Sequence, residues 1–223
     1  MKSVTLNNIL IDHISPTPLC EIMGRNKSDK GSIDISKSWH NYTTFYYSLF
    51  KDLKDKPLNI FELGIGSQKS EFPNNMGENG RPGASLYGWR EFFPNANIFG
   101  ADIDKSILFK DERIKTFYCD SRNPEIITSM WKNTELPESF DIIIDDGLHI
   151  LDANITFFEN SLHKLSRSGL FIIEDVGSFE ACYPHIHYLN NKYNNISVQY
   201  LSIPCPVNTN GDNNLIIIKK NLH

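Results

Sequence analysis

The stretch FDIIIDDGLH places groups that can bind a cation or move a proton directly after a run of apolar residues. The run ends in Asp145 and Asp146, and His149 follows three residues after the second aspartate. Carboxylates are common ligands of hard divalent cations, and a histidine accepts a proton near neutral pH. These residue types at this spacing therefore indicate acid–base or metal chemistry.

Polar residues follow the other apolar runs as well. LFIIED, further along the chain, ends in Glu174 and Asp175. Three earlier runs end in glycines, acids or a serine, which are Glu62, Gly64, Gly66, Asp102, Asp104, Asp120 and Ser121. A single acidic strand end is often an ordinary helix cap. Five along one sheet edge indicate a ligand site, because ligands of open α/β sheets bind outside the carboxyl ends of the strands.

The pattern of apolar runs predicts the sheet that would bring these side chains together. Seven strand-like runs are present, at residues 58–63, 96–102, 113–119, 140–145, 169–175, 196–203 and 214–220. Helix-like segments lie between several of them, at 84–93, 123–133 and 151–166. Continuous apolar strands separated by helices predict an α/β fold with a mostly parallel sheet covered on both faces. The last two runs have no helix between them and predict a C-terminal antiparallel hairpin.

Length and composition limit the number of domains and the functions that the chain can have. The chain has 223 residues, of which 40% are hydrophobic, enough for one domain with a substantial core. Residues 36–56 carry apolar side chains at helical spacing. We therefore expect an N-terminal helical segment over residues 1–56 and the main domain over residues 57–223. A net charge of −5 disfavours a general nucleic-acid-binding function.

The cysteines and the N-terminus predict the cellular location. Four widely spaced cysteines form no CxxC pair, as is typical of reduced thiols in a cytosolic protein. Polar residues interrupt the first apolar stretch, so no signal peptide is expected, and no run approaches membrane-spanning length. We expect a cytoplasmic protein without a membrane or nucleic-acid partner. The oligomeric state, including a homo-oligomer, stays open.

The motif ELGIG argues against a dinucleotide site. Such a site has the form GxGxxG with an acidic residue about 20 residues further on. Here Lys69 stands at the third glycine position, and the next acid at a strand end is the distant Asp102. NAD binding is therefore disfavoured. Gly64 and Gly66 still allow a ligand to approach the backbone, and Asp102 is suited to bind ribose hydroxyls.

The motifs FELGIG, GASLYGWREFFPNANIFGADID, FDIIIDDGLH and GLFIIEDV together resemble class I S-adenosylmethionine-dependent methyltransferases, which have a Rossmann-like fold. More narrowly, they are similar to the macrocin-type O-methyltransferases that modify sugar hydroxyls in macrolides. The upstream SDKGSIDISKSWHNYTTFYYSLF is similar to the Asp-Lys and His-x-Tyr segment of that group. The match runs from about Asp29 to Val176, and DDGLH followed by IIED is its most specific part.

The resemblance implies S-adenosylmethionine as cofactor and a role for each matching residue. Asp102 would hold the ribose, and Asp120 with Ser121 would lie near the adenine. The residues around the methionine part would be Glu62, Gly64 and Gly66.

The resemblance also implies a metal site. Asp146, Glu174 and Asp175 would be ligands of a divalent ion, with Mg²⁺ the expected metal, and His149 would be the general base. Neighbouring residues on a strand point to opposite faces. Asp146 is therefore assigned to the metal, whereas Asp145 lies on the cofactor side or is structural.

Such a site would overcome a specific chemical barrier. A sugar hydroxyl has a pKa on the order of 15. A histidine titrates near ~6.5, so direct proton transfer faces a gap of about 12 kcal/mol. A metal bound to the hydroxyl removes several pKa units of that gap. The predicted function is S-adenosylmethionine- and Mg²⁺-dependent O-methylation of a small-molecule acceptor, namely a sugar, a nucleotide-linked sugar or a glycan-building intermediate.

Two alternatives stay open for the function. One is a methyltransferase for another small polar acceptor, such as a phosphorylated, phenolic or amine compound. The other is a non-catalytic cofactor-binding protein, which has no use for an intact set of Asp146, His149, Glu174 and Asp175.

One segment departs from the resembled group, which passes almost directly from the glycine motif to the next helix. This chain inserts SQKSEFPNNMGENGRP, residues 67–82, which we expect to be an irregular loop. It is either a lid, a part of the acceptor pocket or a passive surface insertion. His40 and Tyr42 are also ambiguous, because the resemblance puts them near the active site while helical periodicity makes Tyr42 a packing residue.

Overall fold

The structure, a computed structural model, describes residues 5–6, 9–10, 15–72, 74–77, 80–205 and 207–221. The remaining positions of the predicted 1–56 segment and of the predicted 67–82 loop lie outside the described residues. A small antiparallel sheet near the N-terminus consists of β1 (Thr5–Leu6) and β2 (Ile9–Leu10). No helix within the described part of the chain is both long enough and apolar enough to cross a membrane.

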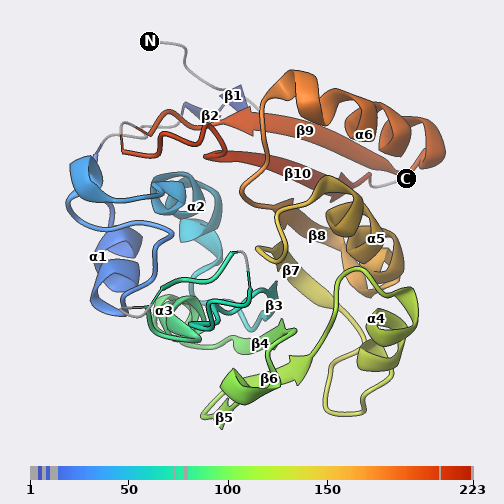
Figure 1. Ribbon diagram of the computed structural model, residues 1–223, viewed down its shortest axis with the longest axis horizontal. Helices are drawn as coiled ribbons and strands as arrows, with labels where there is room; N and C mark the ends of the chain where they lie inside the picture. Colours follow the sequence, from blue (N-terminus) through green and yellow to red (C-terminus); the bar gives the residue numbers. More distant parts are fainter. Residues whose placement is uncertain are drawn as a thin grey trace.

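The main sheet has eight strands in the order β5-β6-β4-β3-β7-β8-β10-β9 (Figure 1). Its parallel strands are β3 (Asn59–Leu63), β4 (Asn97–Asp102), β6 (Ile114–Tyr118), β7 (Phe140–Asp145) and β8 (Leu165–Ile173). Its antiparallel strands are β5 (Lys110–Asp111), β9 (Ile196–Ser202) and β10 (Asn214–Lys220). The mostly parallel sheet and the C-terminal hairpin are confirmed. The predicted count of seven misses β5, because two residues are too few to form a pattern.

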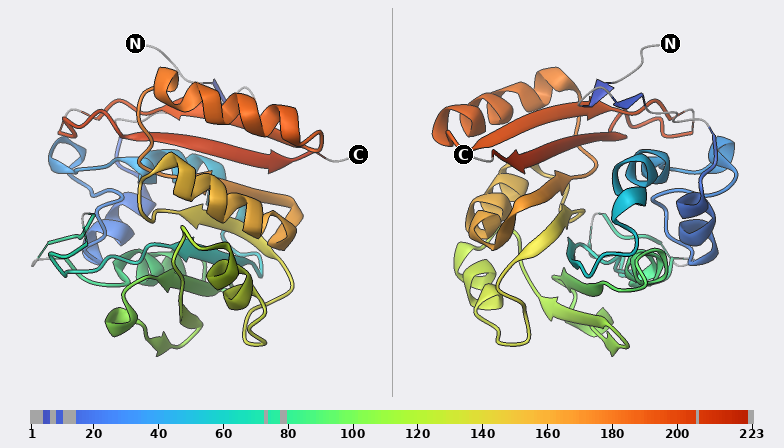
Figure 2. Two further views of the ribbon diagram at one scale, coloured as in Figure 1. Left: turned by 45° about the vertical axis from the view of Figure 1, so that its right-hand side comes forward. Right: turned by 180° about the vertical axis from the view of Figure 1, so that it is seen from behind.

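Helices lie on both faces of this sheet (Figure 2). One face carries α2 (Tyr42–Phe50) and α3 (Ala84–Phe92), with α1 (Pro18–Arg25) packed against both of them. The other carries α4 (Pro124–Trp131), α5 (Leu151–Ser161) and α6 (Phe179–Lys192). Short 3-10 helices are found at Ile35–Lys37, Lys51–Leu53, Lys105–Ile107 and Leu162–Lys164. Each face has its own hydrophobic core, since alternate strand residues such as Ile60 and Phe61 belong to opposite cores.

The helix predicted over residues 36–56 is shorter than expected. Residues 38–41 form a loop, and α2 begins only at Tyr42. Asn41 has a non-helical backbone (φ −128°, ψ 32°), and its side chain donates to the carbonyl of Pro204. Trp39, counted as part of the apolar face, is 41% exposed. The loop matters for function because it brings His40 to the sheet edge where the predicted site residues lie.

Candidate active site

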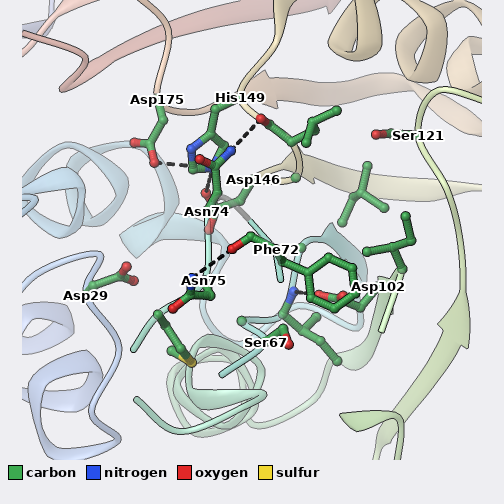
Figure 3. A pocket seen from close by; sticks show the side chains of 18 of the residues that line it. Asp29, Ser67, Phe72, Asn74, Asn75, Asp102, Ser121, Asp146, His149 and Asp175 are labelled. Carbon is green, nitrogen blue, oxygen red and sulfur yellow. Dashed lines mark hydrogen bonds and ion pairs between the residues drawn. The ribbon is translucent and has the colours of Figure 1, made fainter. Parts of the chain in front are cut away.

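A cavity of about 600 Å³ opens at the carboxyl ends of the parallel strands (Figure 3). This volume lies within the range of small-molecule and cofactor sites. The predicted site residues on its wall are Gly64, Gly66, Asp102, Asp120, Ser121, Asp146, His149 and Asp175. The sheet thus brings together residues from five strand ends, as the sequence predicted.

Gly64 allows two loops of the site to pack against each other. Its backbone is left-handed (φ 83°), and a Cβ placed there would lie 1.9 Å from the carbonyl oxygen of Asp146. Gly66 has a similar backbone (φ 84°), and a Cβ there would meet the sulfur of Met76 at 2.5 Å. A side chain at either position would therefore push the glycine loop away from its neighbours.

Asp102 holds the glycine loop in place. Its Oδ2 accepts from the backbone N–H of Ile65 at 2.9 Å, and its Oδ1 accepts from that of Asp104 at 2.8 Å. Burial raises the pKa of Asp102, although these backbone hydrogen bonds oppose the change. Asp102 nevertheless lines the cavity, and each carboxylate oxygen can accept a second hydrogen bond.

Asp146, His149 and Asp175 form a cluster that can hold a cation. His149 Nε2 lies 3.2 Å from Asp146 Oδ1 and 3.4 Å from Asp175 Oδ2. The three potential ligand atoms all lie within 4.8 Å of one another. His149 (φ 56°) and Asp175 (φ 54°) have left-handed backbones, which side-chain-bearing residues seldom adopt. Such strain is typical of functional sites, where the surrounding structure imposes it.

The charges of this cluster act strongly on the imidazole. Burial alone would lower the pKa of His149, but the hydrogen bond with Asp146 and the charges of Asp146 and Asp175 outweigh it and raise the pKa to about 9. His149 is therefore protonated near neutral pH when no metal ion is bound between the two carboxylates. The imidazolium then has the role of the counter-ion between two carboxylates, a place that a divalent cation also fits.

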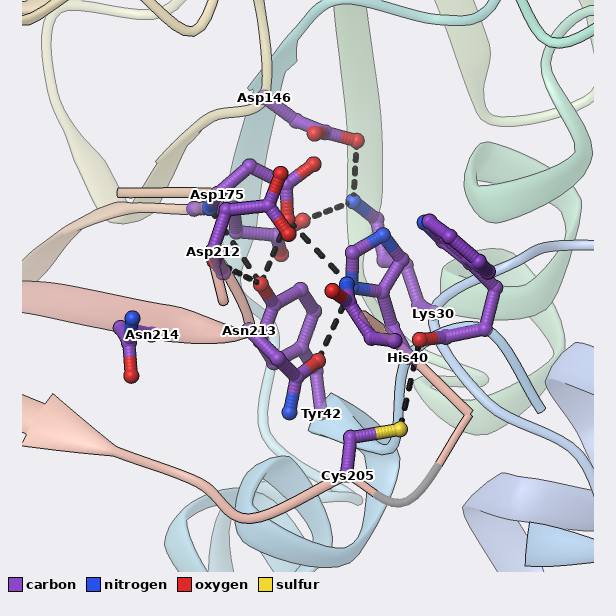
Figure 4. A network of polar contacts seen from close by, with 12 residues as sticks. Lys30, His40, Tyr42, Asp146, Asp175, Cys205, Asp212, Asn213 and Asn214 are labelled. Carbon is purple, nitrogen blue, oxygen red and sulfur yellow. Dashed lines mark hydrogen bonds and ion pairs between the residues drawn. The ribbon is translucent and has the colours of Figure 1, made fainter. Parts of the chain in front are cut away.

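His40 and Tyr42 both contact this cluster (Figure 4). Tyr42 donates its hydroxyl to Asp175 Oδ1 at 2.5 Å, and His40 Nδ1 lies 3.5 Å from the same oxygen. The two rings are stacked, with centroids 4.8 Å apart. Tyr42 is therefore a buried core residue whose hydroxyl also contacts the site. The packing role and the place near the active site, which the sequence analysis gave as alternatives, both apply to it.

Comparisons with known proteins agree with this geometry. No family model matches the chain. Its sequence is 30% identical over 161 residues to the 8-demethyl-8-(2-methoxy-alpha-L-rhamnosyl)-tetracenomycin-C 3'-O-methyltransferase of Streptomyces olivaceus, covering 72% of this chain and 37% of that protein. It is 31% identical over 140 residues to the demethylmacrocin O-methyltransferase of Streptomyces fradiae, covering 62% of this chain and 32% of that protein.

Among solved structures, the MycE methyltransferase of the mycinamycin biosynthetic pathway, in complex with Mg and SAH, matches with a TM-score of 0.67. The sequences are 25% identical, and the match covers 93% of this chain and 56% of that one. The chain has the fold of a class I methyltransferase. It resembles the macrocin-type O-methyltransferases, although it spans only about a third of the length of the curated relatives it matches.

Three predicted site residues do not line the cavity of this methyltransferase fold. Asp145 accepts from Asn154 at 3.0 Å and from the N–H of Gly147 at 3.2 Å. The other two are Glu62 and Glu174, whose carboxylates contact protein side chains instead of the cavity. In both acidic pairs only the second member, Asp146 or Asp175, faces the cavity. Alternation of side chains separates Asp145 from Asp146. It does not explain the second pair, because Asp145 pairs with Ile173 and Glu174 is therefore in register with Asp146. Asp175 reaches the cavity through its left-handed backbone (φ 54°), just after the end of β8.

The sequence analysis gave Lys30 no role, although it quoted the Asp-Lys segment that contains it. Its ammonium lies 2.6 Å from Asp146 Oδ2, contacts Glu174 Oε2 and lies 3.7 Å from Glu62 Oε1. Attraction to these carboxylates raises the pKa of Lys30 well above its ordinary value, although burial opposes the change. The signal was present: a sheet edge with this many acids needs a compensating cation, and Lys30 stands in the Asp-Lys segment.

The inserted loop forms part of the cavity wall. Phe72, Asn74, Asn75 and Met76 line the cavity, and Asn74 donates its side-chain amide to the carbonyl of Leu148 (Figure 3). The loop therefore connects the glycine motif to the residue next to His149. This placement favours a part in ligand binding over a passive surface insertion.

Proposed function

We propose that this chain catalyses the S-adenosylmethionine-dependent methylation of a hydroxyl group on a sugar-bearing small molecule, with Mg²⁺ at the site. The observation that carries the proposal is the placement of Asp146, His149 and Asp175 on the wall of the same cavity as the glycine loop. A cofactor on the glycine loop and an acceptor hydroxyl at the carboxylate cluster would thus share one cavity.

The acceptor class is supported by the relatives. Their names describe methylation of a rhamnosyl group on tetracenomycin C and of demethylmacrocin. We extend this to a glycoside or an activated, nucleotide-linked sugar as acceptor of the present chain. A cytoplasmic location and the division of the chain at residue 56 remain predictions, and the oligomeric state stays open.

The residues present fit a divalent cation. Asp146 Oδ1 and Asp175 Oδ2 lie on either side of His149 Nε2, within 4.8 Å of each other, and both are hard oxygen ligands. The wall of the cavity also carries Asp29, Asp102 and Asp120, an acidic lining that suits a positively charged sulfonium cofactor. When bound, the cofactor supplies an electrophilic methyl group, and the cation supplies positive charge beside the reacting hydroxyl.

The proposed proton acceptor is His149. Its Nε2 points into the carboxylate cluster, so an acceptor hydroxyl placed there lies within hydrogen-bond reach. The two carboxylates that raise its pKa are the proposed cation ligands. Positive charge shared between them would remove the main cause of the elevated pKa and leave the imidazole neutral near physiological pH. Asp146 and Asp175 thereby determine when His149 can accept a proton.

The test uses methyl-labelled S-adenosylmethionine with a panel of acceptors, each with Mg²⁺ and with EDTA. The panel contains α-L-rhamnosides, nucleotide-linked sugars, catechols, phosphorylated sugars and amines. Transfer to a sugar hydroxyl that requires Mg²⁺ is expected. Transfer to a catechol or an amine only would replace the sugar assignment. Isothermal titration calorimetry with S-adenosylhomocysteine and NAD, in which only the first binds, separates a cofactor failure from an acceptor failure.

A further inference from the structure

Lys30 is a buried lysine in the segment between α1 and α2, only 1% exposed. Its ammonium contacts three carboxylates, those of Asp146, Glu174 and Glu62. Figure 4 shows the contact with Asp146. Replacing a buried ion pair by apolar residues of similar size is often neutral or stabilising. Stability alone is therefore a weak explanation for a lysine at this place, and the geometry of its partners gives a better one.

Two of the three carboxylates are held at both oxygens. Glu62 accepts from Ser85 and from the indole N–H of Trp89, the latter at 2.6 Å. Glu174 accepts from the hydroxyl of Tyr46 at Oε1 and from Lys30 at Oε2. Both groups are buried behind the cavity wall, which raises the pKa of each.

Asp146 differs from the other two. Lys30 holds its Oδ2, whereas its Oδ1 faces His149 and the cation cluster. The ammonium therefore determines which oxygen of Asp146 is offered to the cavity. It also occupies the place that a cation would otherwise take between the three carboxylates.

The backbone of Lys30 is fixed firmly enough for this task. Its carbonyl accepts from the N–H of Thr43 in α2 at 3.2 Å. At the next residue, Gly31, a Cβ would lie 2.0 Å from the hydroxyl oxygen of Thr43. Lys30 is thus anchored on the first turn of α2, and its side chain extends from there to the ends of β3, β7 and β8.

We propose that Lys30 is a positioning residue that acts as a built-in cation behind the active site. It presents Asp146 Oδ1 to the metal and to His149, and it keeps a divalent ion out of the pocket formed by Glu62, Glu174 and Asp146 Oδ2. The inference rests on the proposed function where it concerns turnover. The binding of a divalent ion, by contrast, can be measured without an acceptor.

Removing the ammonium should separate ion affinity from turnover. In Lys30→Met three carboxylates lose their cation, so a divalent ion is drawn towards them and away from the productive position. We expect Mn²⁺ to bind at least about tenfold more tightly, because of the extra negative charge. Turnover should fall by about a hundredfold or more, because Asp146 no longer holds His149 and the ion in register.

The matched control is Lys30→Arg, which keeps the charge on a bulkier donor. Its Mn²⁺ affinity should stay within about threefold of the wild-type value while turnover falls in part. A second pair of variants covers the case in which Lys30→Met does not fold. The double variant Lys30→Met/Glu174→Gln removes one charge of each sign, and it is compared with the single variant Glu174→Gln. In this pair, loss of the lysine should again tighten Mn²⁺ binding.

Mn²⁺ titration followed by electron paramagnetic resonance, together with circular dichroism and steady-state kinetics, gives the readouts. Folded Lys30→Met with wild-type Mn²⁺ affinity, or with unreduced turnover, overturns the positioning role alone. Wild-type protein that binds no Mn²⁺ overturns the proposed cation dependence as well. The two failures are therefore distinguishable.

Discussion

His40 Nδ1 lies 2.9 Å from the side-chain oxygen of Asn213, and this contact fixes the tautomer of the neutral imidazole. The amide nitrogen of Asn213 donates to Asn41 Oδ1 at 2.8 Å and to the carbonyl of Ile203 at 2.7 Å. The oxygen of Asn213 must therefore be the atom that faces His40, so Nδ1 carries the proton. Nε2 is left as an acceptor, and His40 lines the cavity.

This tautomer predicts that His40 binds a hydroxyl of the acceptor. His40→Asn keeps a donor near the Nδ1 position but removes Nε2, so the KM for the acceptor should rise by about tenfold, the usual scale of a lost hydrogen bond. The Kd for S-adenosylhomocysteine should not change. His40→Gln, which keeps an acceptor near the Nε2 position, is the matched control and should recover part of the loss. Equal KM values in all three proteins would contradict the prediction.

The raised pKa of His149 predicts a pH-dependent stability of the metal-free protein. The folded-state pKa of about 9 lies above the ordinary value of 6.5, so the charged ring stabilises the fold fully below pH 6.5. This contribution, on the order of 3 kcal/mol, is lost as the pH rises through 9. Urea unfolding in EDTA at pH 6 and pH 9.5 should show the loss in the free energy of unfolding.

The control for this experiment is His149→Gln. It lacks a titrating ring, so its free energy of unfolding should change by less over the same pH range. A wild-type profile parallel to that of His149→Gln would show that the two carboxylates do not act on the imidazole as the structure implies.

Sequence patterns predicted the sheet because each strand is a continuous apolar run, and they located Asp146, His149 and Asp175 because strand ends share one edge. The acidic sheet edge calls for a compensating cation, but sequence patterns could not show that Lys30 contacts Asp146 from 116 positions away in the chain. Nor could they predict that Glu174 faces Lys30 and Tyr46, since the direction of a side chain after a strand depends on local turns. Contacts of this kind arise from tertiary packing, and no local pattern records them.

Asp146 and His149 should fail in different ways. Asp146→Asn weakens a proposed ion ligand, so it should lose Mg²⁺-dependent turnover while keeping cofactor affinity, and excess Mg²⁺ should restore part of it. His149→Ala should keep its affinity for Mg²⁺ and for the cofactor. Its turnover should fall about a hundredfold, the usual scale for a general base. Mg²⁺ should not restore it. Steady-state rates over a series of Mg²⁺ concentrations test both variants. Full activity of His149→Ala would show that the histidine is not the general base.

The inserted loop should couple the cofactor site to the loop that carries His149. Asn74 crosses from the insertion to the carbonyl of Leu148, whereas Asn75 donates to Phe72 within the insertion itself, at 2.7 Å. Asn74→Ala should therefore speed amide hydrogen exchange over residues 146–150 and raise the Kd for S-adenosylhomocysteine by about tenfold, because the cavity wall opens. Asn75→Ala removes an amide of the same size and should leave exchange over 146–150 near the wild-type rate.

Hydrogen exchange with mass spectrometry, with and without S-adenosylhomocysteine, compares the three proteins. If ligand protects 67–77 in the wild type but not in Asn74→Ala, the loop closes on the cofactor through Leu148. Unchanged exchange over 67–77 on ligand binding would instead identify the insertion as a fixed wall.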